Sequence, residues 1–187
     1  MAIYCPNIPL TFVHIPKTAG SAVSSWLRKH AHGTDFYPLS FGSKHWTFRQ
    51  VERNMRKGRL DAGTVVVVVR NPWDRLVSTW AYYRRRKKSW CPEDFRDFVM
   101  NTSWGTAKRC QTEFFPWNKT LILRFENLAT DFRQIQSLCN NDSPLDIVNE
   151  SDHKHYTEYY DNETYKEVAK RHAADITTLR YSYENNA

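Results

Sequence analysis

The chain has 187 residues and a mass of 22.2 kDa, a length that fits one domain spanning residues 1–187. Hydrophobic residues make up 41% of the sequence and charged residues 25%, which excludes an extensively disordered protein. Because 27 Lys and Arg outnumber 20 Asp and Glu, the net charge of +7 favours anionic partners such as nucleotides, acidic glycans or nucleic acids.

The first third of the chain alternates short apolar runs with helical patterns. Leu10–Ile15 predicts a strand, which a turn of small residues separates from a helix over Ala22–His30. A short strand over Asp35–Leu39 and a polar amphipathic helix over Thr47–Lys57 follow. The pattern is therefore strand, loop and helix, twice in succession.

The most distinctive element is Thr64–Val69, which is β-branched throughout. The lack of alternation is typical of a strand covered on both faces, and we expect it at the centre of a parallel sheet. The remaining predicted elements are helices over Trp73–Lys87, Glu93–Met100, Leu128–Leu138 and Glu163–Leu179 and a strand over Leu121–Phe125. The alternation predicts a three-layer α/β fold with a central parallel sheet flanked by helices. In such sheets ligands bind beyond the carboxyl ends of the strands.

The sequence contains no membrane-spanning or secretory pattern. Its longest purely apolar run is Val65–Val69, whereas a membrane-spanning helix needs about 20 residues. Met1–Leu10 has neither the basic start nor the apolar stretch of a signal peptide, so we expect a cytoplasmic protein. No two of the four cysteines have the two-residue gap of zinc or redox sites, and we predict free thiols and no metal site.

The segment HIPKTAGS, residues 14–21, follows the first predicted strand. A loop of small residues between a strand and a helix can turn backbone N–H groups inward around an anion, and the helix adds the positive end of its dipole. Lys17 supplies a full charge, and Thr18 and Ser21 supply hydroxyl donors. The loop suits a phosphate or a sulfate, with an ordinary strand-to-helix turn as the alternative. It is not a Walker A motif, because its lysine precedes its glycine.

The segment RNPWDRLVS, residues 70–78, follows the central strand. Arg70 leaves the strand at its carboxyl end, and Ser78 lies about two helical turns further on. A guanidinium fork and a hydroxyl can converge on one phosphate. The alternative is a strand-end salt bridge for Arg70 and a helix-surface position for Ser78.

In this order and spacing the two segments resemble the PAPS-dependent sulfotransferases, particularly the carbohydrate branch with the heparan sulfate 2-O- and 6-O-sulfotransferases. HIPKTAGS resembles the family's 5′-phosphosulfate loop, and RNPWDRLVS resembles its 3′-phosphate loop. ILRFENL (residues 122–128) is similar to the late strand and acidic turn, and VNESDHKHYTEYYD (residues 148–161) to the segment near the nucleotide. The likeness is to the compact bacterial and phage members. Ala19 and Ala22 depart from it, since many relatives have Gly or a hydroxyl residue there.

The resemblance implies a P-loop-like sulfotransferase fold, PAPS (3′-phosphoadenosine 5′-phosphosulfate) as the donor and PAP as its product. It also implies a carbohydrate hydroxyl as the acceptor, which the basic run of residues 82–88 allows to be anionic, and no part for a metal, a membrane or nucleic acid. Lys17 is a catalytic candidate because it meets the charge on the oxygen that bridges sulfur and the 5′-phosphate, an effect of about 3 to 4 kcal/mol per donor. The donor-binding candidates are Lys17, Thr18, Ala19, Gly20, Ser21, Ala22, Arg70, Ser78, Lys154 and Tyr156.

The acceptor hydroxyl needs a general base, and the candidate among seven histidines is His45. It falls in the loop after the second predicted strand, and the pair Lys44 and His45 resembles the base position of the 2-O-sulfotransferase branch. An unperturbed imidazole is mostly neutral at pH 7 and can accept a proton. Glu126 is the alternative base. The candidates for acceptor contact are His45, Trp46, Trp104 and Gln111.

Two other functions remain open from the sequence. A nucleotide-dependent phosphotransferase would also bind phosphate, but the Walker lysine is missing and Arg70, not an acidic residue, follows the central strand. A basic nucleic-acid-binding module would account for the net charge of +7 but leaves the small-residue loop without a purpose.

Overall fold

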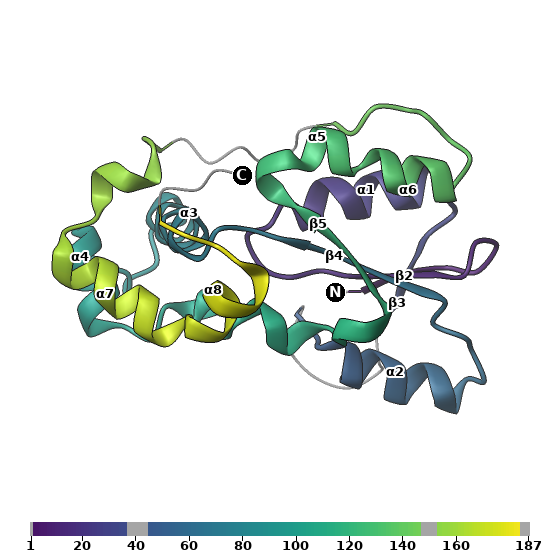
Figure 1. Cartoon of the computed structure of the whole chain (residues 1–187), viewed down its shortest axis with the longest axis horizontal. Helices are drawn as coiled ribbons and strands as arrows, with labels where there is room; N and C mark the ends of the chain where they lie inside the picture. The colour runs from purple at the N-terminus through teal and green to yellow at the C-terminus, as the bar shows by residue number, and fades with distance from the viewer. Residues whose placement is uncertain (1, 37–44, 147–152, 184–187) are drawn as a thin grey trace. The chain divides into compact units, whose positions relative to one another are not determined.

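The computed structural model describes residues 2–36, 45–146 and 153–183, and Figure 1 draws their helices and strands. The chain forms two compact units, the first from Met1–Val69 and Glu113–Asn149, the second from Arg70–Thr112 and Glu150–Ala187. Each unit has a hydrophobic core of its own. Because each unit contains two separate segments of the chain, the units are not consecutive domains, and the single domain over residues 1–187 stays a prediction.

The first unit is built on a five-stranded sheet with the strand order β3-β1-β2-β4-β5. The strands are β1 (Ala2–Cys5), β2 (Leu10–Val13), β3 (Thr34–Phe36), β4 (Thr64–Val69) and β5 (Thr120–Arg124). β4 pairs in parallel with β2 on one side and β5 on the other, which confirms its predicted central place. Among the described strands, β1 alone runs opposite to the other four, because it is antiparallel to both β2 and β3.

The predicted central parallel sheet is confirmed in β2, β4 and β5, and β1 is the strand that departs from it. Only four residues join β1 to β2, and a connection of that length permits a hairpin, whereas a parallel crossover needs a dozen or more residues. β1 has no counterpart among the elements predicted from the sequence. The predicted strand over Asp35–Leu39 corresponds to β3, and its last residues lie outside the described part of the chain.

Helices cover both faces of this sheet (Figure 1). They are α1 (Gly20–His30), α2 (Phe48–Lys57), α5 (Leu128–Asp131) and α6 (Arg133–Leu138). Val66 and Val68 of β4 pack against Trp26 of α1 on one face, and Val51 and Met55 of α2 pack on the other. Alternate residues of a strand point to opposite faces, so the valines of β4 contribute apolar side chains to both faces of the sheet. The three-layer α/β arrangement is confirmed.

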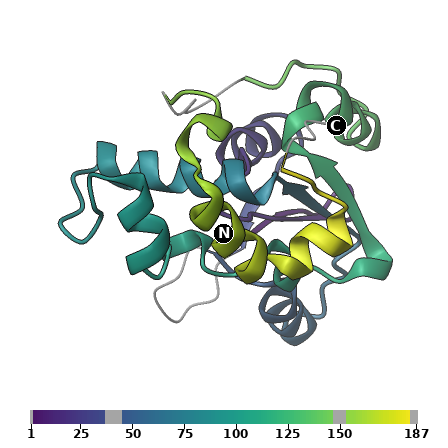
Figure 2. The same cartoon turned by 60° about the vertical axis from the view of Figure 1, so that its left-hand side comes forward.

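The second unit is helical and rich in aromatic side chains. Its helices are α3 (Pro72–Arg85), α4 (Phe95–Asn101), α7 (Asn162–Arg171) and α8 (Ala173–Leu179). Trp73, Phe98 and Trp104 lie in its core with almost no exposure. The helix predicted over Glu163–Leu179 is interrupted at His172, and Figure 2 shows α7 and α8 as two successive helices.

Candidate functional site

The loop between β2 and α1 has the backbone of an anion-binding turn. Lys17 and Ala19 have left-handed φ angles of 67° and 62°, a conformation that non-glycine residues adopt rarely and that clusters at ligand sites. Left-handed residues in a turn direct successive N–H groups to one side. The first N–H groups of α1, which begins at Gly20, have no partner within the helix and add to this positive end.

The side chains of this loop divide into exposed and buried ones. Lys17 is half-buried and Ser21 is exposed, as an anion ligand requires. Thr18 is fully buried, and its Oγ1 donates a hydrogen bond to the carbonyl oxygen of Ile15 at 3.0 Å. The hydroxyl thus stabilises the loop itself in this conformation, and the contact of Thr18 with the donor stays a prediction.

Two histidines lie beside this loop, at the carboxyl end of β2. A Cβ atom on Gly20 would lie 2.1 Å from Cδ2 of His14, so glycine permits the close approach of the helix to the imidazole. The His45 ring packs edge-on against the His14 ring with centroids 5.2 Å apart, and its Nδ1 lies 3.4 Å from the His14 carbonyl oxygen. The structure thus brings His45, the predicted base, next to the residue that opens the loop.

His14 is held in its neutral form. Burial is the main cause, and the positive charges of His45, Arg28 and Lys17 add to it, so that the pKa of His14 falls from 6.5 to about 3. Its Nδ1 is enclosed and has no hydrogen-bond partner. A neutral His14 ring adds no further positive charge beside Lys17.

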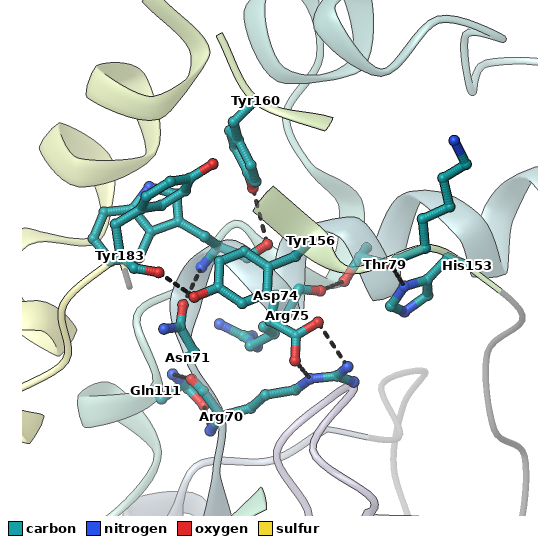
Figure 3. A network of polar contacts seen from close by, with 12 residues as sticks. Arg70, Asn71, Asp74, Arg75, Thr79, Gln111, His153, Tyr156, Tyr160 and Tyr183 are labelled. Atoms are coloured by element: carbon teal, nitrogen blue, oxygen red, sulfur yellow. Dashed lines mark hydrogen bonds and ion pairs between the residues drawn. The ribbon is translucent and has the colours of Figure 1, made fainter. Parts of the chain in front are cut away.

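Arg70 directly follows β4 and is fixed at the start of α3 (Figure 3). Asn71 caps this helix by accepting the Trp73 N–H at 3.0 Å. The Arg70 guanidinium, 6% exposed, donates from Nε and Nη2 to the two carboxylate oxygens of Asp74 at 2.8 and 2.9 Å. Ser78, one helical turn beyond Asp74, is buried on the same face of α3. The predicted alternative, a strand-end ion pair for Arg70, is thus present, and it also orients the guanidinium.

A buried glutamine fixes the backbone of Arg70. Gln111 accepts the Arg70 N–H at 2.9 Å and donates from Nε2 to the Arg70 carbonyl oxygen at 2.8 Å. Asp175 in turn accepts the backbone N–H groups of Gln111 and Thr112 at 2.7 and 2.9 Å. Gln111 has no exposed surface, so it positions Arg70 and does not reach an acceptor as predicted.

The carboxyl-terminal segment packs around the same part of α3 within the second unit (Figure 3). Tyr156 is buried, and its hydroxyl donates to the Tyr183 carbonyl oxygen. Asn71 Nδ2 donates to the Ser182 carbonyl oxygen at 2.9 Å. Lys154 is exposed, with Nζ 3.4 Å from a Glu158 carboxylate oxygen. Tyr156 therefore supports the Arg70 region from within, whereas Lys154 remains accessible to an anion.

Comparisons with known proteins identify the family of the chain. A sequence profile of the sulfotransferase family matches residues 1–184. The chain belongs to the sulfotransferase family. No curated protein matches it significantly. Among solved structures, the crystal structure of a sulfotransferase from Alicyclobacillus acidocaldarius is similar in fold, with a TM-score of 0.51 and 13% identity over 90% of this chain and 93% of that one.

The residues predicted to contact the acceptor of this sulfotransferase differ in how exposed they are. Trp104 is fully buried, its Nε1 donates to the Val99 carbonyl oxygen at 2.8 Å, and no sugar ring can stack on it. This prediction is wrong because the indole belongs to the core of the second unit. Trp46 is half-buried and packs against the cluster of Ala2, Val51 and Met55, and its contact with an acceptor stays a prediction. Glu126, the alternative base, lies half-buried in the short turn after β5.

Sequence reasoning missed Asp74 and Asp175, the two carboxylates of the sulfotransferase that organise Arg70. The spacing of Arg70 and Asp74, four residues apart at a helix start, was a usable signal for an ion pair. Asp175 gave no signal for its contact with the Arg70 region, because Gln111 and Thr112 lie more than sixty residues away along the chain. In the described part of the chain no helix is long and apolar enough to cross a membrane, and the cytoplasmic location stays a prediction.

Proposed function

We propose that this sulfotransferase transfers a sulfuryl group from PAPS to a carbohydrate hydroxyl. The observation that carries the proposal is the loop after β2, in which left-handed Lys17 and Ala19 and the start of α1 create a cationic turn for an anion. The 5′-phosphosulfate of the donor binds to this loop through backbone N–H groups, Lys17 and Ser21. Gly20 and Ala22 are buried below it and keep the turn tight.

The 3′-phosphate of the donor binds to Arg70 and Ser78, with Lys154 as a further cation and Tyr156 as a support. β2 and β4 are parallel neighbours, so the chain leaves both strands at the same edge of the sheet, and Arg70 is the residue after β4. A guanidinium fixed by Asp74 suits directional binding of phosphate oxygens. Selection of the 3′-phosphate distinguishes this donor from ATP.

In the reaction the acceptor oxygen forms a bond to sulfur, and the bond between sulfur and the bridging oxygen of the 5′-phosphate breaks. The products are a sulfate ester and PAP. Lys17 stabilises the negative charge that grows on the bridging oxygen, which is worth about 3 to 4 kcal/mol for one well-placed donor. The transferred group carries a single negative charge, and we assign the reaction no metal ion.

His45 takes the proton of the acceptor hydroxyl as the new bond forms. Its position beside His14, at the strand end from which the loop starts, supports this role. Trp46, the next residue, offers one face of its indole to a sugar ring. The exposed basic residues 85–88 at the end of α3 favour an acidic carbohydrate over a neutral one.

The proposal is tested by incubation with PAPS and a panel of neutral and acidic oligosaccharides. Mass spectrometry should detect an oligosaccharide that gains one SO₃ group together with an equal amount of PAP. Lys17→Ala should lose this activity, and Lys29→Ala, which removes an exposed lysine at the end of α1, should keep it. Transfer from ATP in place of PAPS, or equal activity in the two variants, would contradict the proposal.

A further inference from the structure

We propose that Cys110, His172 and Asp175 form a binding site for a divalent transition metal ion, with Zn²⁺ the best match. One ligand atom from each of the three side chains lies within 4.8 Å of the other two. All three residues belong to the second unit, where Cys110 precedes the segment that carries Gln111 and His172 stands at the break between α7 and α8. The ion would take no part in the proposed sulfuryl transfer itself, although Asp175 also holds Gln111, which fixes the backbone of Arg70.

The geometry of the His172 and Asp175 pair fits two ligands of one ion. His172 Nδ1 lies 3.5 Å from Asp175 Oδ2 and is buried without a hydrogen-bond partner. Ligand atoms of a tetrahedral Zn²⁺ lie about 3.3 to 3.6 Å apart, given bonds of about 2.0 to 2.3 Å to nitrogen, oxygen and sulfur. His172 Nδ1 and Asp175 Oδ2 are therefore spaced as two ligands of one ion would be.

The surroundings hold these two ligands in place. The His172 ring stacks on Trp104 with centroids 5.4 Å apart, which fixes the imidazole plane. Asp175 is oriented by the backbone N–H groups of Gln111 and Thr112. Supports of this kind around ligands are typical of metal sites.

Cys110 completes the ligand set and provides access. Its thiol is partly exposed, with Sγ 3.5 Å from the Arg171 carbonyl oxygen, so a modest rotation can bring sulfur to the ion. A thiolate, a carboxylate and a neutral imidazole balance the charge of a divalent ion, and this mixture of sulfur, nitrogen and oxygen ligands suits Zn²⁺. Three protein ligands leave the fourth position to water.

The first experiment titrates the metal-free protein with Co²⁺, which reports thiolate ligation by a sulfur-to-metal charge-transfer band. We expect the band to saturate at one equivalent and to disappear when Zn²⁺ displaces Co²⁺. Cys110→Ser should abolish the band, His172→Asn should weaken Co²⁺ binding at least about tenfold, and Cys139→Ser should leave it unchanged. Cys139 is the matched control, since it is likewise a free, partly exposed thiol and lies in the first unit.

The second experiment needs no variant. Zn²⁺ should protect Cys110, but not Cys139, from alkylation of the wild-type protein by iodoacetamide, as measured on peptides by mass spectrometry. The proposal is overturned if the wild type gives no charge-transfer band, if Cys110→Ser retains the band, or if Zn²⁺ leaves the alkylation rate of Cys110 unchanged.

Discussion

Replacement of His14 by asparagine should make the protein markedly more resistant to acid. The pKa of His14 is lowered to about 3 in the native state, chiefly by burial, whereas a histidine in the unfolded chain titrates near 6.5. Between pH 6.5 and pH 3 the His14 imidazole is protonated in the unfolded state but not in the native state. Stability is therefore fully present above pH 6.5 and is lost as the pH falls toward 3.

The size of this loss follows from the two pKa values. At pH 4.5 the unfolded histidine is two pH units below its pKa, and each unit is worth about 1.4 kcal/mol, so His14 alone lowers the free energy of unfolding by about 2.7 kcal/mol relative to pH 7.5. Asparagine cannot be protonated in this range, so His14→Asn should lose this component of the pH dependence. Other titrating groups are common to both proteins and cancel in the comparison.

The assay is urea unfolding followed by circular dichroism at pH 7.5 and pH 4.5. The drop in the free energy of unfolding between these pH values should be smaller in His14→Asn by about 2 to 3 kcal/mol. His32→Asn, which removes an exposed histidine at a left-handed position that asparagine tolerates, should behave as the wild type. An equal drop in the wild type and His14→Asn would refute the assignment of a neutral, buried imidazole below the loop.

Three further results are expected. His45→Ala should keep the fold and the affinity for PAP but lose about 10² to 10⁴ in kcat; a variant that keeps more than about a tenth of wild-type kcat would shift the role of base to Glu126. Sulfuryl transfer, assayed well below the melting temperature, should survive EDTA, and a loss that Mg²⁺ restores would favour a phosphotransferase. Gln111→Leu should lower the free energy of unfolding by about 2 to 5 kcal/mol, because it removes the two hydrogen bonds that Gln111 makes with the Arg70 N–H and carbonyl oxygen. Urea unfolding measures this loss, with the exposed Gln134→Leu as the control. An effect no larger than that of the control would contradict the role of Gln111.

The parts of the fold that could be predicted are those determined by residues close together along the chain. The run of five valines in β4 predicts burial on both faces, and Asn71 followed by proline predicts the start of α3. β1 escaped prediction because it has only four residues and its pairing depends on the hairpin to β2. The break at His172 escaped because the sequence around it carries no glycine or proline.

The parts of the candidate site that could be predicted are likewise those that follow a strand directly in the sequence. The loop after β2 and the Arg70 segment follow strands directly, so topology alone places them at the ligand edge. Trp104 and Gln111 were misjudged because exposure is decided by contacts distant in sequence, such as Gln111 with Arg70 and Asp175. The group of Cys110, His172 and Asp175 has no local spacing, since Cys110 lies far from the other two along the chain.

The most direct test of the proposed donor site is isothermal titration calorimetry with PAP and with adenosine 5′-phosphate, which lacks the 3′-phosphate. The wild type should bind PAP at least about tenfold more tightly, since a charge-assisted hydrogen bond contributes about 1.5 to 3 kcal/mol. Arg70→Ala should remove most of this preference and leave the affinity for adenosine 5′-phosphate nearly unchanged. If the wild type binds both ligands equally well, or Arg70→Ala still prefers PAP to the same extent, the assignment of Arg70 to the 3′-phosphate is contradicted.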